Sequence, residues 1–176
     1  MTRAFATKSC ALVATIAAPL LLTILPAWSQ AKPAPDVMVT HRLSAPLASE
    51  IAAEVVAACA RQGYAETAVV VDADGLQQAV LRGDGAGAHT LDSANNKAYT
   101  AATFKTDTSK LAERAPKSPE FAALFTLPHL IAAGGGVAIK IGDETVGAVG
   151  AAGAPGFNLD EGCAQAGIAK VRDRLK

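Results

Sequence analysis

Three histidines, His41, His89 and His129, are the side chains of this sequence best suited to binding a metal or moving a proton. None lies four residues from another, so no helix can present two of them to one ion. No carboxylate is fixed beside them in the sequence, and no Gly-x-Ser-x-Gly motif marks a catalytic serine. The spacing of these residues therefore gives no argument for an enzyme.

A second group of candidates shares one face of a predicted helix. Lys97, Thr100 and Phe104 are spaced i, i+3 and i+7, so a cation, a hydroxyl and an aromatic ring point the same way. The glycine-rich segment 82–87 could hold an anion with its backbone amides, but it matches neither a phosphate-binding loop nor a dinucleotide fingerprint. We interpret that segment as an ordinary tight loop.

The elements that must position these residues alternate between helices and short strands. A helix begins at the Ser-Ala-Pro sequence 44–46 and runs to about Gln62, and a second spans 90–104. Strands are predicted at 67–71 and 76–81, which form one hairpin, with a further short strand at 130–132, and the last helix runs from residue 158 or 160 to the end. Paired strands between helices predict an α+β fold with a mainly antiparallel sheet.

The glycine-rich block 134–156 reads as a second hairpin, with apolar runs on either side of the turn at Gly142. Glycines at 147, 150 and 153 with alanines between them leave this ribbon almost without side chains. Such a backbone allows another surface to approach closely. The sequence leaves open whether a helix, another subunit or a ligand does so.

Residues 1–31 have the organisation of a secretory signal peptide, with Arg3 and Lys8 before an apolar run that is too short for a membrane span. We expect a leader at 32–43, a single domain at 44–176, and a periplasmic or secreted protein without a membrane anchor after cleavage. The whole sequence balances 16 basic against 16 acidic side chains. No basic patch therefore predicts nucleic-acid binding.

Two cysteines, Cys59 and Cys163, lie in the predicted mature chain. Export permits a disulfide between them, but their spacing does not define the geometry. Cys59 falls on the apolar stripe of its helix with Ile51 and Val55, which favours a buried free thiol.

The order of several short motifs resembles the GlcG/HbpS-like family over residues 47–169. The matching pieces are VVVDADG at 69–75, RGDGA at 82–86, SANNKAYTA at 93–101, GGGVAI at 134–139, VGAVGAAGA at 146–154 and the late Asp160. This resemblance implies a five-stranded antiparallel sheet flanked by helices in a profilin-like arrangement. It also implies a homo-oligomer and a haem ligand, with Thr100 as the residue associated with iron.

Granting the resemblance, Thr100 would offer an oxygen to iron, Phe104 an apolar surface and Lys97 a cation to a propionate. The alternative is that Thr100 and Phe104 pack against another subunit. His89 is the best-placed histidine because it precedes the helix that carries Thr100, although helix capping or solvent exposure is its ordinary role. We interpret His129 as structural and His41 as solvated.

The leading hypothesis is an exported, oligomeric haem-binding protein that scavenges, stores or helps to sense haem. The alternative is an enzyme or enzyme accessory acting on a small hydroxy acid or a corrinoid, and it rests on the resemblance alone. A third possibility is a structural subunit whose glycines serve only packing.

Overall fold

The computed structural model describes residues 36–176, and the compact unit comprises Met38–Lys176. The predicted signal peptide at 1–31 and the start of the leader lie outside the described residues. Residues 38–43 are irregular but belong to the compact unit, because Leu43 is buried in the core and His41 binds Glu144. Within the described part of the chain, no helix is both long and apolar enough to cross a membrane.

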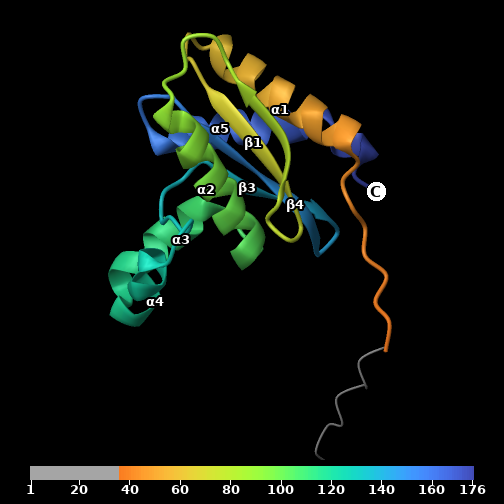
Figure 1. Ribbon diagram of the computed structural model, residues 1–176, viewed down its shortest axis with the longest axis vertical. Coiled ribbons are helices and arrows are strands. Elements are labelled where there is room, and N and C mark those ends of the chain that lie inside the picture. Colours follow the sequence, from red (N-terminus) through yellow and green to blue (C-terminus); the bar gives the residue numbers. More distant parts are fainter. Residues whose placement is uncertain (1–35) are drawn as a thin grey trace, which may run out of the picture. The chain divides into compact units, whose positions relative to one another are not determined.

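Four antiparallel strands form the sheet, in the order β2-β1-β4-β3 (Figure 1). They are β1 Thr67–Asp72, β2 Gln77–Arg82, β3 Gly136–Ile141 and β4 Glu144–Ala152. The two predicted hairpins and the antiparallel sheet are confirmed, with β1 and β4 paired at the centre. The edges of the sheet are therefore β2 and β3.

The prediction of five strands is wrong for this chain, because the segment at 130–132 forms no strand. Its backbone amide at Ile131 donates to Thr100 Oγ1 at 3.0 Å instead of to a neighbouring strand. The Thr100 side chain, on the helix His89–Phe104, thus accepts the hydrogen bond that a fifth strand would need.

The described residues form five α-helices: α1 Ala45–Ala60, α2 His89–Phe104, α3 Thr108–Arg114, α4 Pro119–Ala123 and α5 Phe157–Lys170. Short 3-10 turns follow at Ala115–Lys117, Leu124–Thr126 and Arg172–Arg174. The helix α1 begins as predicted, since the Ser44 side chain accepts a hydrogen bond from the amide of Leu47. Helices α1 and α5 pack together on one face of the sheet, and α2 packs against the other (Figure 1).

The glycine-rich strand β4 allows α2 to lie directly on the sheet. A Cβ atom at Gly150 would overlap the carbonyl oxygen of Ala94 and lie 2.6 Å from the amide nitrogen of Ala98. Both partners belong to α2. The close approach that the sequence predicted is therefore made, at this glycine, by a helix of the same chain.

A disulfide joins Cys59 on α1 to Cys163 on α5, with the two Cα atoms 5.4 Å apart. The interpretation of Cys59 as a buried free thiol is therefore wrong. Its position on the apolar stripe is as predicted, but the same stripe faces α5, where Cys163 is equally buried.

Candidate functional site

Lys97 lies inside the protein, with 1% of its surface exposed. Its Nζ atom is 2.6 Å from Asp160 Oδ2 and 2.9 Å from the carbonyl oxygen of Ala151. Within one chain, the ammonium group is thus enclosed by these two partners and is not exposed at the surface of α2. Lys97 is among the buried residues of α2, and its long side chain reaches Ala151 on β4 and Asp160 on α5.

Glu66, just ahead of β1, completes a buried charge cluster with Lys97 and Asp160. Burial and, to a smaller extent, the nearby Asp160 carboxylate raise the pKa of the Glu66 carboxyl to about 8, although Lys97 opposes the shift. No partner in residues 36–176 binds Glu66 Oε1. The sequence singled out Lys97 and Asp160 separately, but no pattern in it related them to each other or to Glu66.

Thr100 is fully buried, and its hydroxyl is already used. Oγ1 accepts the hydrogen bond from the amide of Ile131 and lies 3.4 Å from the carbonyl oxygen of His129, to which it can donate. In this chain Thr100 therefore holds the 129–131 loop against α2. Its hydroxyl does not face solvent.

Phe104 lies one turn beyond Thr100, half-buried in an aromatic cluster. Its ring centroid is 5.9 Å from that of Phe121 and 6.0 Å from that of Phe125. These contacts give Phe104 a packing role within the chain, and they tie the end of α2 to α4 and the turn that follows it.

His89 and Thr100 occupy opposite ends of α2. They are eleven residues apart, which corresponds to about 16 Å along a helix. A metal ion needs ligands at about 2 Å, so these two side chains of one chain cannot bind the same ion. Within one subunit, the structure therefore does not bring these two candidate ligands together.

The histidine that lies beside Thr100 is His129, which the sequence had suggested was structural. Its backbone is left-handed, with φ of 67°, and its ring is exposed. Nδ1 lies 3.3 Å from Asn96 Oδ1, and the ring meets Tyr99 edge-on at 6.0 Å. We refer to His129, Thr100, Tyr99 and Asn96 as the His129 face. The described residues contain no cluster of three or more potential metal ligands of the His, Cys, Asp or Glu type.

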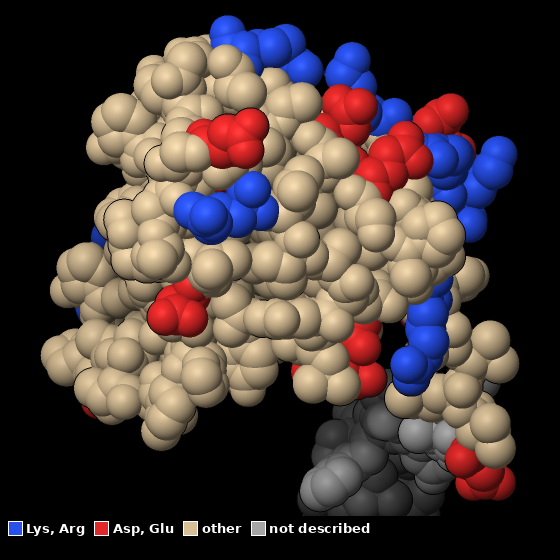
Figure 2. All heavy atoms as spheres, turned by 45° about the horizontal axis from the view of Figure 1, so that its top comes forward, with Lys and Arg blue, Asp and Glu red and all other residues tan. Residues whose placement is uncertain are grey.

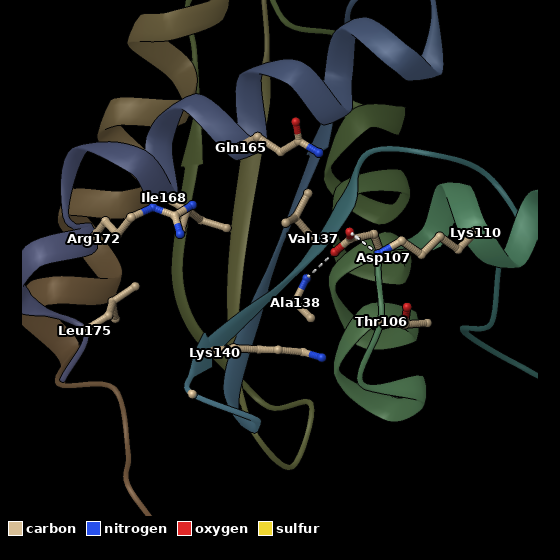
Figure 3. A pocket seen from close by; sticks show the side chains of 11 residues that line it. Thr106, Asp107, Lys110, Val137, Ala138, Lys140, Gln165, Ile168, Arg172 and Leu175 are labelled. Atoms are coloured by element: carbon tan, nitrogen blue, oxygen red, sulfur yellow. Dashed lines mark hydrogen bonds and ion pairs between the residues drawn. The ribbon is translucent and has the colours of Figure 1, made fainter.

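A cavity of about 580 Å³ lies along the edge strand β3 and is here named the β3-edge cavity (Figure 3). It is lined by Thr106, Asp107, Lys110, Val137, Ala138, Lys140, Gly142, Gln165, Ile168, Arg172 and Leu175. Arg172 and Lys110 approach from opposite sides in this view, and Lys140 comes from β3 itself. No predicted site residue lines this cavity.

A second cavity of about 350 Å³ lies beside Phe157 at the start of α5. The Phe157 ring is 60% exposed, and its centroid is 5.0 Å from Lys97 Nζ. Glu161 lines the same cavity, where its carboxylate accepts from the Ser109 hydroxyl at 2.7 Å and the Gly135 amide at 3.2 Å. The carboxylate is thus already engaged in holding α5 to the rest of the chain.

Residues 43–169 match the sequence profile of the family described as "Haem degrading protein HbpS-like". A double mutant of HbpS from Streptomyces reticuli has 34% sequence identity and a TM-score of 0.72, covering 80% of this chain and 94% of that one. A second HbpS crystal structure has 33% identity and a TM-score of 0.73, with 80% and 98% covered. No curated protein sequence matches.

A crystal structure described as a PduOC:heme complex is also similar, with 24% identity and a TM-score of 0.67. That match covers 73% of this chain and 94% of the other. At this level of identity it shows a common fold and nothing about the ligand of this chain.

Proposed function

The chain belongs to the HbpS-like family, and from this premise we propose that it is an exported haem-binding protein that works as a homo-oligomer. The observation that carries the proposal is the exposed imidazole of His129, whose backbone carbonyl lies within hydrogen-bond distance of Thr100 Oγ1 on α2. Imidazole is the commonest protein ligand of haem iron, whereas a threonine hydroxyl binds iron weakly.

The His129 face has the side chains that haem requires. His129 would supply the iron ligand, and Tyr99 beside it would supply an aromatic contact. Bound haem would supply redox-active iron. Thr100 would act through the backbone, because its hydroxyl fixes the loop that sets the position of His129.

Three of the predicted site residues take different places in this proposal. Lys97 stabilises the interior next to the site, and Phe104 forms part of the adjoining aromatic cluster. His89 is exposed at the far end of α2, so it can contribute only if a second subunit presents it. We therefore keep His89 in the test.

Two features support export and assembly. A buried disulfide is typical of proteins from oxidising compartments, which agrees with a periplasmic or secreted location. Figure 2 shows a face with few charged side chains over a broad central area, and the edge strand β2 exposes Val80 and Leu81. Subunit interfaces commonly form at uncharged surfaces and at exposed edges of sheets.

A haemin titration of the purified protein, followed by the Soret band, tests the proposal. We expect saturable binding that His129→Ala weakens by about tenfold or more, because the iron loses its ligand. His89→Ala is the matched control if the site lies within one subunit. Absence of saturable binding by the unsubstituted protein would contradict the function, whereas binding unaffected by His129→Ala would contradict only the site.

Thr100→Ala separates positioning from ligation. If Thr100 only holds the loop, the variant should keep the spectral signature of histidine ligation while its affinity for haemin falls.

Light scattering after size exclusion measures the oligomeric state, and a monomer at micromolar concentration would contradict the proposed homo-oligomer.

A further inference from the structure

The β3-edge cavity is positively charged and open to solvent (Figure 3). Three cationic side chains and one carboxylate, Asp107, line it. The two Asp107 oxygens are already engaged, since Oδ1 accepts from the amide of Ala138 at 3.2 Å and Oδ2 pairs with Lys110 Nζ at 3.0 Å. Among the described residues, no carboxylate pairs with Lys140 or Arg172.

Two unpaired cations therefore face one cavity from different elements. Lys140 comes from β3, and Arg172 comes from the turn that follows α5. Val137 and Ile168, each 7% exposed, line the same cavity. A ligand that matches this surface has two anionic groups joined by a short apolar body.

The edge of β3 is not open to an added peptide strand at this point. The amide of Gly136 donates to Thr108 Oγ1 at 2.9 Å, and that of Ala138 donates to Asp107. Side chains at the start of α3 thus occupy the hydrogen bonds that an incoming strand would use. A small molecule fits this edge better than a peptide.

The cavity is also unsuited to haem iron, because no histidine, cysteine, methionine or tyrosine lines it. None of its lining residues belongs to the His129 face. We propose that the β3-edge cavity is a separate binding site for a small organic dianion, a linear dicarboxylate, held by Lys140 and Arg172 over Val137 and Ile168.

Glutarate, a five-carbon dicarboxylate, is the probe, and isothermal titration of the purified protein is the measurement. We expect saturable binding that raises the melting temperature, since a ligand bound only by the folded state stabilises it. Butyrate, with one carboxylate, should bind about tenfold more weakly because it can satisfy only one cation. Equal binding of butyrate and glutarate would overturn the assignment of a dianion site.

The double substitution Lys140→Gln/Arg172→Gln removes both charges with little change in size. It should weaken glutarate binding by about tenfold or more, while Lys117→Gln, at an exposed lysine outside the cavity, should leave it unchanged. No saturable glutarate binding up to roughly 10 mM, or equal binding by the double variant, would overturn the proposal. His129→Ala should bind glutarate normally, which separates this site from the proposed haem site.

Discussion

Glu66 Oε2 lies 3.1 Å from Sγ of Cys59, the sulfur that is bonded to Cys163. A disulfide sulfur carries no proton, so the proton of this contact belongs to Glu66. That assignment agrees with a Glu66 pKa raised to about 8, which keeps the carboxyl protonated near neutral pH. The disulfide thus borders the buried charge cluster directly.

The disulfide should contribute strongly to stability, because it closes a loop of 104 residues. In the chain-entropy account, a loop of this length stabilises the fold by about 3 to 5 kcal/mol. We expect Cys59→Ala/Cys163→Ala to lower the free energy of unfolding by about that amount, measured by urea denaturation. An unchanged unfolding midpoint would show that α1 and α5 hold together without the bond.

Glu66 should make the stability depend on pH. Its pKa is higher in the folded protein, about 8, than the ordinary value of 4.5, so the folded state holds more protons between these pH values. The stabilisation is fully present below about pH 4.5 and is lost as pH rises through about 8. The free energy of unfolding should therefore fall over this window, by at most about 1.4 kcal/mol per pH unit from this group.

Glu66→Gln keeps the shape of the protonated side chain and removes its titration. We expect the variant to show a flatter pH profile and to exceed the unsubstituted protein in stability at pH 8. Urea denaturation at intervals from pH 5 to pH 8 measures both. Parallel profiles for the two proteins would assign the pH dependence to other groups.

The ion pair between Lys97 and Asp160 should be sensitive to the loss of one partner. Lys97→Met fills much of the same space but leaves the Asp160 carboxylate buried without its cation. We expect a loss of about 3 to 5 kcal/mol in the free energy of unfolding.

Lys110→Met is the matched control for Lys97→Met. It breaks an exposed pair with Asp107, for which the expected loss is about 1 kcal/mol or less. Adding Asp160→Asn to Lys97→Met should cost less than the two single changes together, because no unpaired charge remains. Equal effects of Lys97→Met and Lys110→Met would contradict a structural role for the buried pair.

Local patterns in the sequence were sufficient to predict both hairpins, α1, α2 and the close approach to the glycine-rich strand. Each depends on near neighbours in the chain, such as the Ser44 cap or the continuous apolar, β-branched run of β1. The spacing of Lys97 and Thr100 predicted a shared face, but it could not show that Asp160 and Ile131, distant in sequence, occupy both polar groups.

The positions of the histidines relative to Thr100 likewise depend on tertiary contacts. His89 is near Thr100 in sequence but an entire helix away in space, whereas a left-handed turn at His129 returns the chain to Thr100. The cysteine bridge and the β3-edge cavity likewise join segments that no local pattern relates. Tertiary contacts of this kind decide which polar groups remain available to a ligand.

The contact between α2 and β4 gives the sharpest packing test. Gly150→Ala adds one methyl group where the carbonyl oxygen of Ala94 and the amide nitrogen of Ala98 leave no room. Both obstacles are helix backbone, so the helix as a whole must move away from the sheet. We expect a loss of about 3 kcal/mol or more in the free energy of unfolding, comparable with overpacking of a rigid core.

Gly162→Ala is the same chemical change at a position in α5 with no atom within 4 Å of the added Cβ. Alanine favours a helix over glycine by about 1 kcal/mol, so this variant should be as stable as the unsubstituted protein or more so. If Gly150→Ala lowers the free energy of unfolding and Gly162→Ala raises it, the loss at Gly150 comes from its contact with α2. If Gly150→Ala were tolerated as well as Gly162→Ala, the glycines of β4 would not be needed for the helix to reach the sheet, and a partner or ligand would again be required to explain them.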